Sequence, residues 1–375
     1  MRADEADRRR LNDLFVELCR IESPSGREAE CAARVRAELE GLGLPVEADE
    51  AGNVLARVAA AGDPDGSVML CAHLDTVKLE APVEPALVDD GWENANEGIL
   101  GADNKAAVAM LLAIAHRAAA APPPIGLELL FTISEEVGLV GAQAFDLDRL
   151  RSRFGYVFDH ATPIGEIVLA APTYYRVEAE FRGAAAHAGI RPEQGRSAIS
   201  AAVAAIAAMR LGRLDDETTA NVGRIAGGGE STNVVPERCR VEAEARSLDT
   251  EKAEAVVAEM VDHLYDGANA YECDADVTVQ RLWPGYRIRP SANAVAVAEA
   301  ALQAAGYEPR HIDTGGGSDA NAFNAAGFEC VNLANGTERN HEPGERVTAA
   351  ALEDMLDVAI ALLAEAASLP AAAAR

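Results

Sequence analysis

The distribution of hydrophobic positions over the first 160 residues predicts strands and helices that alternate along the chain. Short apolar runs predict strands at 54–58, 67–77, 125–134 and 155–160. Apolar positions at helical spacing predict helices over 3–20, 27–43, 104–120 and 138–152. Strands that alternate with helices are typical of an α/β domain with a mostly parallel sheet.

The pattern changes at about Pro172, where strands with strict apolar and polar alternation begin. Four such strands are predicted at 174–183, 221–228, 238–249 and 276–283, with helices at 195–212 and 250–266. Alternating strands have one solvated face, so this segment predicts a small α+β domain of two layers. After Pro284 the α/β pattern returns, with helices over 292–305 and 348–367 and a strand at 329–335. We therefore expect one α/β domain, made of residues 1–171 and 285–375, with a second domain inserted at 172–284.

Charge and cysteine content exclude several classes of function. A formal net charge of −28 over 375 residues argues against nucleic acid and anionic membrane surfaces as partners. No apolar run reaches the ~18–20 residues that span a bilayer, and the first residues lack the apolar core of a signal peptide. The six cysteines are scattered without C-x-x-C spacing, as in reduced proteins. We expect a cytoplasmic protein with neither membrane nor nucleic-acid partners.

Six polar side chains lie where predicted strands of the α/β domain end or where a helix begins. They are His73, Asp75, Asp103, Glu135, Glu136 and Asp159. Ligands of parallel sheets bind beyond the carboxyl ends of the strands, so these side chains are expected to share one cleft. Imidazole and carboxylate ligands together suit zinc, and also manganese or cobalt. The sequence thus predicts a site for divalent metal, whose cations would relieve the repulsion between the adjacent glutamates.

Four of these residues also have a simpler interpretation, and the spacing of His73 and Asp75 alone is weak evidence for a ligand. Asp103 can cap the helix that follows it. Glu135 and Glu136 can stabilise a helix start through the helix dipole, and Asp159 can be a solvated strand end. The metal interpretation is favoured because all of them fall at the same edge of one sheet.

A series of motifs along the chain carries a family resemblance. They are, in order, "ESPSG", "CAHLDTV", "GADNKAAVAMLL", "FTISEEVGLVGA", "YVFDH", "RGAAAHAGIRPEQGRSAI", "STNVVPERCRVEAEARS", "GGGSDANAF" and "ERNHEPGE". This order resembles the dizinc metallopeptidase superfamily of peptidase T, aminoacylase and carboxypeptidase G, and is most similar to peptidase T-like proteins. The resemblance covers nearly the whole chain. It implies a zinc-peptidase catalytic domain with an inserted lid or dimerisation domain, and a possible homodimer through that domain.

The resemblance also implies roles for the residues at the strand ends. The implied cofactors are two divalent metal ions, zinc in the first place, with manganese or cobalt as alternatives. The implied ligands are Asp103 as the bridge, His73 and Asp159 for one ion, and Glu136 and His341 for the other. Glu135 would be the general base, which takes a proton from the attacking water, and Asp75 would support His73. A cis peptide bond between Asp103 and Asn104 is also expected.

In the inserted domain, the resemblance assigns His187 to stabilisation of the oxyanion. It assigns substrate binding to Asn233 and Arg246, and Arg246 could hold a terminal carboxylate through two hydrogen bonds. Gly316 would bring its backbone close to the substrate, and Ser318 would bind substrate or cap the next helix. The simpler interpretation of His187 and Arg246 is that both are surface residues.

The expected function is hydrolysis of short peptides by an aminopeptidase or tripeptidase. Aspartate at the position of Asp159 is typical of the aminopeptidases and dipeptidases of this superfamily, whereas deacylases carry glutamate. The first alternative is an amidohydrolase that removes acyl groups from N-acyl amino acids. A second alternative is a binding protein that has kept the fold without turnover.

Overall fold

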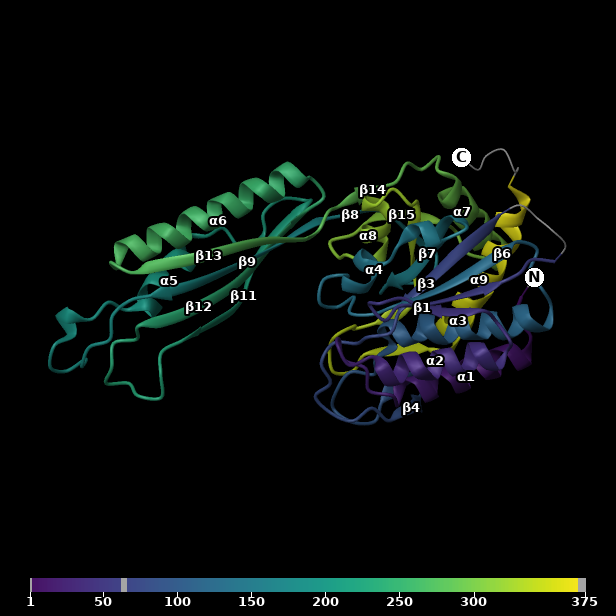
Figure 1. The fold of residues 1–375 in the computed structure, drawn as a ribbon, viewed down its shortest axis with the longest axis horizontal. Coiled ribbons are helices and arrows are strands. Elements are labelled where there is room, and N and C mark those ends of the chain that lie inside the picture. The colour runs from purple at the N-terminus through teal and green to yellow at the C-terminus, as the bar shows by residue number, and fades with distance from the viewer. Residues whose placement is uncertain (1, 62–65, 370–375) are drawn as a thin grey trace. The chain divides into compact units, whose positions relative to one another are not determined.

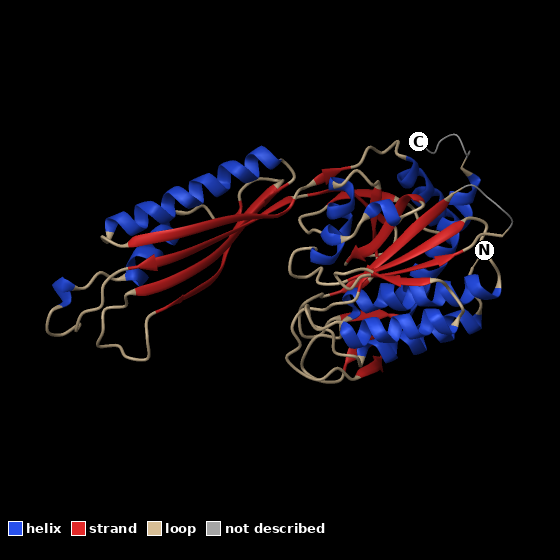
Figure 2. Ribbon diagram, viewed as in Figure 1, coloured by secondary structure: helices blue, strands red, loops and turns tan. Residues whose placement is uncertain are grey.

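The computed structural model describes residues 2–61 and 66–369, which form two compact units (Figures 1 and 2). The first unit contains the described residues up to Ala170, those of Arg287–Asp313, and those from Ser318 onward. The second contains Ala171–Tyr286 and the short segment Thr314–Gly317.

The first unit is built on a nine-stranded sheet in the order β1-β2-β6-β3-β7-β16-β8-β14, with β15 paired to β8. The strands are β1 (Val46–Ala48), β2 (Val54–Val58), β3 (Ser67–His73), β6 (Gly126–Thr132), β7 (Ser152–His160), β8 (Glu166–Ala171), β14 (Tyr286–Arg287), β15 (Arg310–Asp313) and β16 (Cys330–Ala334). The central strands β6, β3, β7 and β16 are parallel, while β1, β2 and β8 add antiparallel pairs toward the edges. This confirms the predicted α/β class with a mostly parallel sheet.

Seven α-helices belong to the described part of this unit. They are α1 (Glu5–Cys19), α2 (Ala29–Gly41), α3 (Ala102–Ala120), α4 (Val140–Ala144), α7 (Asn293–Ala305), α8 (Asp319–Ala325) and α9 (Ala349–Ser368). In the view of Figure 1, α1, α2 and α3 lie below β3 and β6. The predicted helix over 138–152 is wrong in extent. Only α4 and a short 3-10 turn (Leu147–Arg149) form there, because β7 already begins at Ser152.

Strand β3 and helix α3 form the buried centre of the first unit. Every residue of β3 is buried, as in a strand that is covered on both faces. Helix α3 packs against β3 and is itself covered by α1 and α9, which is why its apolar residues do not fall on a single face.

A small second sheet, which the sequence pattern did not predict, joins two distant segments of the unit. Its order is β17 (Thr337–Glu338), β18 (Arg346–Thr348), β5 (Gly91–Asn94) and β4 (Pro85–Val88). The β17–β18 hairpin carries residues 339–345 in its loop, and β5 leads toward the start of α3. The sheet therefore ties the loop that carries His341 to the segment that precedes Asp103.

The second unit is a five-stranded antiparallel sheet with two helices. The elements are β9 (Thr173–Arg182), α5 (Ala198–Ala208), β10 (Gly212–Arg213), β11 (Thr218–Gly227), β12 (Arg238–Ser247), α6 (Thr250–Ala270) and β13 (Asp274–Trp283). The sheet order is β10-β11-β12-β9-β13. The predicted four strands and two helices are present, and β10 is a further, two-residue strand.

The two faces of this sheet differ as the alternation predicts. Residues such as Val177, Phe181 and Val241 point into a core closed by α5 and α6. Their neighbours carry charges that pair between strands, such as Glu178 with Arg240 at 2.7 Å. The face without helices is therefore a polar surface and not a second core.

Within residues 2–61 and 66–369, no helix combines the length and the apolar character needed to cross a membrane.

Candidate active site

Three neighbouring parallel strands deliver polar side chains to one edge of the central sheet. The register pairs His73 at the end of β3 with Thr132 at the end of β6, so Glu135 and Glu136 follow directly beyond that edge. Asp159 lies at the end of β7, on the other side of β3. Side-chain ligand atoms of His73, Glu135 and Asp159 all lie within 4.8 Å of one another.

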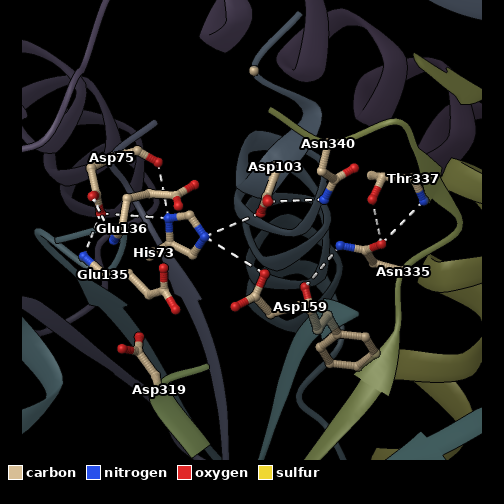
Figure 3. Close-up of polar contacts among 12 residues, drawn as sticks. His73, Asp75, Asp103, Glu135, Glu136, Asp159, Asp319, Asn335, Thr337 and Asn340 are labelled. Carbon is tan, nitrogen blue, oxygen red and sulfur yellow. Dashed lines mark hydrogen bonds and ion pairs between the residues drawn. The ribbon is translucent and has the colours of Figure 1, made fainter. Parts of the chain in front are cut away.

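Asp103 connects this group with a second one, and Figure 3 shows its contact with His73. Its Oδ1 lies 3.2 Å from Nε2 of His73, and its Oδ2 lies 3.2 Å from Nε2 of His341. His341 also contacts Glu136, with 2.8 Å between Nε2 and Oε1. The two oxygens of one carboxylate thus face two different histidines, as a bridging ligand requires. The Asp103–Asn104 peptide bond is cis, which confirms that expectation.

The donor set fits divalent metal. Ligand atoms bound to one zinc ion at ~2.0–2.1 Å in tetrahedral geometry lie about 3.3–3.4 Å apart. The separations here run from 2.8 Å for His341–Glu136 to 3.7 Å for His73–Asp159. A second overlapping group, made of His73, Asp103 and Glu136, also meets the 4.8 Å limit. The cluster therefore offers two overlapping sets of three candidate ligands, which share His73.

The two histidines hold their protons strongly when no metal competes. Burial lowers the pKa of His73, but hydrogen bonds with Asp103 and Asp159 outweigh it and raise that pKa well above its ordinary value. Hydrogen bonds with Asp103 and Glu136 raise the pKa of His341 to about 10.

The pKa values of the carboxyl groups are shifted in two opposite directions. Burial raises the pKa of Glu135, with further contributions from Asp159 and other neighbouring charges. Burial and the nearby Asp103 raise the pKa of Asp159 in the same way. Burial acts on Asp103 too, but hydrogen bonds with His341 and His73 reverse the effect and lower its pKa. The site therefore contains more acidic groups than its two imidazoles can neutralise.

Asp75 holds the turn that carries the paired glutamates. One of its oxygens accepts a hydrogen bond from the backbone N–H of Glu135 at 2.9 Å, and the other from that of Glu136 at 3.2 Å. Ser25 of the "ESPSG" motif donates its hydroxyl to the same carboxylate at 2.7 Å. The ring of His73 contacts Asp75 mainly through the backbone carbonyl, 2.9 Å from Nδ1, while the carboxylate lies 3.5 Å away. Asp75 therefore holds the turn through its side chain and contacts the ring of His73 through its backbone carbonyl.

Two more buried carboxylates support the site, and the sequence did not single out either. Glu28 accepts hydrogen bonds from the backbone N–H and the hydroxyl of Ser134, at 3.0 and 2.8 Å. Glu345 accepts three hydrogen bonds from backbone N–H groups at the start of α3. Both are buried, at 6% and 1% exposed. Glu28 lies just before α2 and Glu345 just before β18, and the sequence around them does not distinguish them from surface glutamates.

Asp319, at the start of α8, is a third acid beside the paired glutamates (Figure 3). It is 1% exposed and accepts a hydrogen bond from the hydroxyl of Thr132 at 2.5 Å, while its other oxygen has no hydrogen-bond partner. Burial raises the pKa of Asp319 to about 6. In the sequence, only its position directly after "GGGS" could have indicated that Asp319 lies near the site.

The remaining predicted site residues lie in or near the second unit. His187 and Asn233 are neighbours, because the N–H of Ala188 donates to the carbonyl of Asn233 at 2.8 Å. Arg246 packs over Tyr174, with 4.3 Å from Cζ to the ring centroid, and its Nε and Nη2 both donate to Glu244 at 3.1 Å.

Gly316 and Ser318 flank the end of the glycine run before α8. The N–H of Gly316 donates to the hydroxyl of Thr314 at 3.1 Å. Ser318 belongs to the first unit and forms the cap of α8, where its N–H donates to Asn321 at 3.2 Å.

Two family profiles match the chain. The family described as "Peptidase dimerisation domain" matches residues 173–272. The family described as "Peptidase family M28" matches residues 53–190, which include His73, Asp103 and Asp159.

Three known proteins match nearly the whole chain. The Bacillus subtilis (strain 168) protein named "Uncharacterized protein YqjE" is 34% identical over 368 residues, which cover 96% of this chain and 99% of that protein. The solved structure of aminopeptidase PepT from Bacillus cereus ATCC 10987 is 37% identical, with a TM-score of 0.82, and 96% and 99% of the two chains are covered. The solved structure of a tripeptidase from Staphylococcus aureus subsp. aureus Mu50 is 32% identical, with a TM-score of 0.88 and the same coverage.

The raised pKa values predict how the metal-free chain responds to pH. The proton on His341 stabilises the fold fully below the ordinary pKa of 6.5, and this contribution is lost as pH rises toward about 10. The raised pKa values of Glu135 and Asp159 act in the same direction, because their charged forms are disfavoured in the folded state. With a chelator present, the melting temperature should therefore fall between pH 6.5 and pH 10.

The matched control is the variant His341→Gln, which should show a shallower fall over the same range. The variant His263→Gln, on the surface of α6, should behave like the unmodified chain. Equal slopes for all three proteins would contradict the role assigned to the His341 contacts.

Proposed function

Since the chain belongs to the peptidase T-like family of dinuclear metallopeptidases, we propose that it is an aminopeptidase that acts on tripeptides and other short peptides. The observation that carries this proposal is the cluster at the sheet edge, in which two histidines and four acidic residues converge around Asp103. Support for cleavage at the amino end comes from the similarity to the aminopeptidase and the tripeptidase, together with an aspartate at position 159.

We assign the metal ligands as the contacts suggest. His73, Asp103 and Asp159 would hold one ion, and Asp103, Glu136 and His341 the other. When bound, two divalent ions supply Lewis acidity to the scissile carbonyl and to the attacking water. Zinc is the proposed metal because imidazole and carboxylate ligands at these separations suit it.

Glu135 is the proposed general base. It is buried and lies beside the cluster, and its raised pKa brings it closer to neutral pH, where a base can both take and return a proton. Glu135 accepts a proton from the attacking water as the carbon–oxygen bond forms. It then gives that proton to the leaving amine as the carbon–nitrogen bond breaks. Asp75 positions Glu135 for both transfers through the hydrogen bond to its backbone N–H.

The proposed substrate contacts come mainly from the second unit. His187 would stabilise the oxyanion, and Asn233, Gly316 and Ser318 would bind the substrate backbone. Arg246 would bind the substrate carboxylate. Glu244 occupies Nε and Nη2 of Arg246, so the N–H groups that remain on its two terminal nitrogens can still form a pair of parallel hydrogen bonds.

A deacylase remains the second candidate, and blocked substrates separate the two. With zinc, manganese or cobalt added, tripeptides with a free amino end should be cleaved after the first residue, as read by mass spectrometry. The same tripeptides with an acetylated amino end should be cleaved much more slowly. Cleavage of only the acetylated peptides would overturn the aminopeptidase proposal in favour of the deacylase.

Glu135→Gln tests the base. The side chain keeps its size but can no longer accept the proton, so kcat should fall by about 10²- to 10⁴-fold. Bound metal and melting temperature should stay close to those of the unmodified chain. Glu338→Gln, an exposed control in the β17–β18 hairpin, should keep full activity. If Glu135→Gln kept more than about a tenth of the activity, another group would have to be the base.

We also propose that the second unit forms a homodimer. Support comes from the match of residues 173–272 to a peptidase dimerisation domain. In the described structure, β13 is an edge strand that pairs only with β9, and its Val279 is 42% exposed. Sedimentation should show a species of twice the 39.3 kDa chain mass, and Val279→Arg should shift it toward single chains. A single-chain mass for the unmodified protein would exclude the dimer.

A cytoplasmic location is proposed from the cysteines. All six are buried and unpaired in the described structure, as expected in a reducing compartment. Recovery of the protein in the extracellular or membrane fraction of its native cells would contradict this.

A further inference from the structure

The loop between β17 and β18 contributes more to the site than His341. Within residues 339–345, Asn340 and Glu345 both reach Asp103, which is more than 230 residues away in the chain. We propose that Glu345 is a positioning residue that fixes the backbone of Asp103, so that this carboxylate stays in its bridging position. The inference rests on the proposed metal-bridging role of Asp103.

Glu345 forms a complete set of contacts with the start of α3. Its Oε2 accepts hydrogen bonds from the N–H groups of Leu100 at 2.9 Å and Gly101 at 2.8 Å. Its Oε1 accepts one from the N–H of Asp103 at 2.9 Å. Leu100 and Gly101 precede α3, and the backbone of Asp103 and Asn104 is not helical, so these N–H groups have no partner within the helix and depend on the carboxylate of Glu345.

The same loop also holds the side chain of Asp103. Nδ2 of Asn340 donates to Oδ2 of Asp103 at 2.9 Å (Figure 3), and the same oxygen lies 3.2 Å from Nε2 of His341. One short loop therefore supplies a proposed ligand, a donor to the bridging carboxylate, and an acceptor for its backbone. The position of His341 relative to Asp103 follows from this arrangement, because Glu345 lies only four residues after His341.

A carboxylate is needed at position 345 because three donors point at it. Glutamine offers one acceptor oxygen, and in either orientation its NH₂ group would face at least one of the three backbone N–H groups. The resulting unpaired N–H would be buried, since Glu345 is 1% exposed. The start of α3 would then lose its fixed position, and Asp103 with it.

The test compares Glu345→Gln with Glu342→Gln, which makes the same change at an exposed position of the same loop. In Glu345→Gln, transfer of bound cobalt to a chelator should be about 10- to 100-fold faster. The visible absorption of the bound cobalt should change, and kcat should fall while KM stays nearly constant. In the metal-free protein, amide hydrogen exchange should increase at residues 100–103. Glu342→Gln should match the unmodified chain in every measurement.

The proposal would be overturned if Glu345→Gln and Glu342→Gln had the same rate of cobalt release, the same visible absorption and the same amide exchange rates. Should Glu345→Gln fail to fold, Glu345→Asp retains both acceptor oxygens and is compared with Glu342→Asp in the same assays. In the unmodified, metal-free chain, the amides of Leu100, Gly101 and Asp103 should exchange more slowly than that of exposed Asn96. Equal exchange rates would also overturn it.

These measurements test the proposed peptidase function and the positioning role of Glu345 separately. An unmodified chain that binds no divalent metal and cleaves no peptide would refute the proposed function. The amide exchange of residues 100–103 would still show whether Glu345 holds the start of α3.

Discussion

An excess of buried negative charge is the constraint on which the site depends. Six carboxyl groups, on Asp75, Asp103, Glu135, Glu136, Asp159 and Asp319, gather near two imidazoles, of which His73 is buried and His341 is 47% exposed. Buried like charges are costly unless cations compensate them. The fold can keep these groups together only if each carboxylate either binds a cation, shares a proton, or accepts several hydrogen bonds.

The structure assigns these tasks to different residues. Carboxylates that face the centre are delivered by strand ends and by the start of α3. A second group, Glu28, Asp75 and Glu345, faces backbone N–H groups instead. Each of these three holds one of the turns that carry the central residues. The acidic residues of this region therefore include both the proposed ligands and the residues that hold the backbone beside them.

The sequence predicted the parts of this arrangement that depend on periodicity. Long buried strands such as β3 and β6 have a strong hydrophobic pattern, so their ends, and with them His73 and Glu135, could be placed beforehand. The order of the motifs added His341, which no local pattern would have brought to the site. The strict alternation of β9 and β12 predicted correctly which face of the inserted sheet is buried.

The missed features are those that only long-range contacts define. Strands of two or three residues, such as β17 and β18, carry too few positions for any periodicity. Glu345 has the sequence context of a surface residue, and only the hairpin turns it toward α3. Asp75 was expected to support His73. In the structure the backbone carbonyl of Asp75 lies 2.9 Å from Nδ1 of the ring, and no sequence pattern indicates that the backbone makes this contact.

The insertion of one unit within another has a consequence for synthesis of the chain. His73, Asp103 and Asp159 leave the ribosome before the second unit, whereas Asn340, His341 and Glu345 follow only after it. While the second unit is being made, the first unit therefore contains the acidic side chains but lacks His341 and also Glu345, which binds the start of α3. The second of the two proposed ligand sets is therefore complete only once β18 has paired with β5.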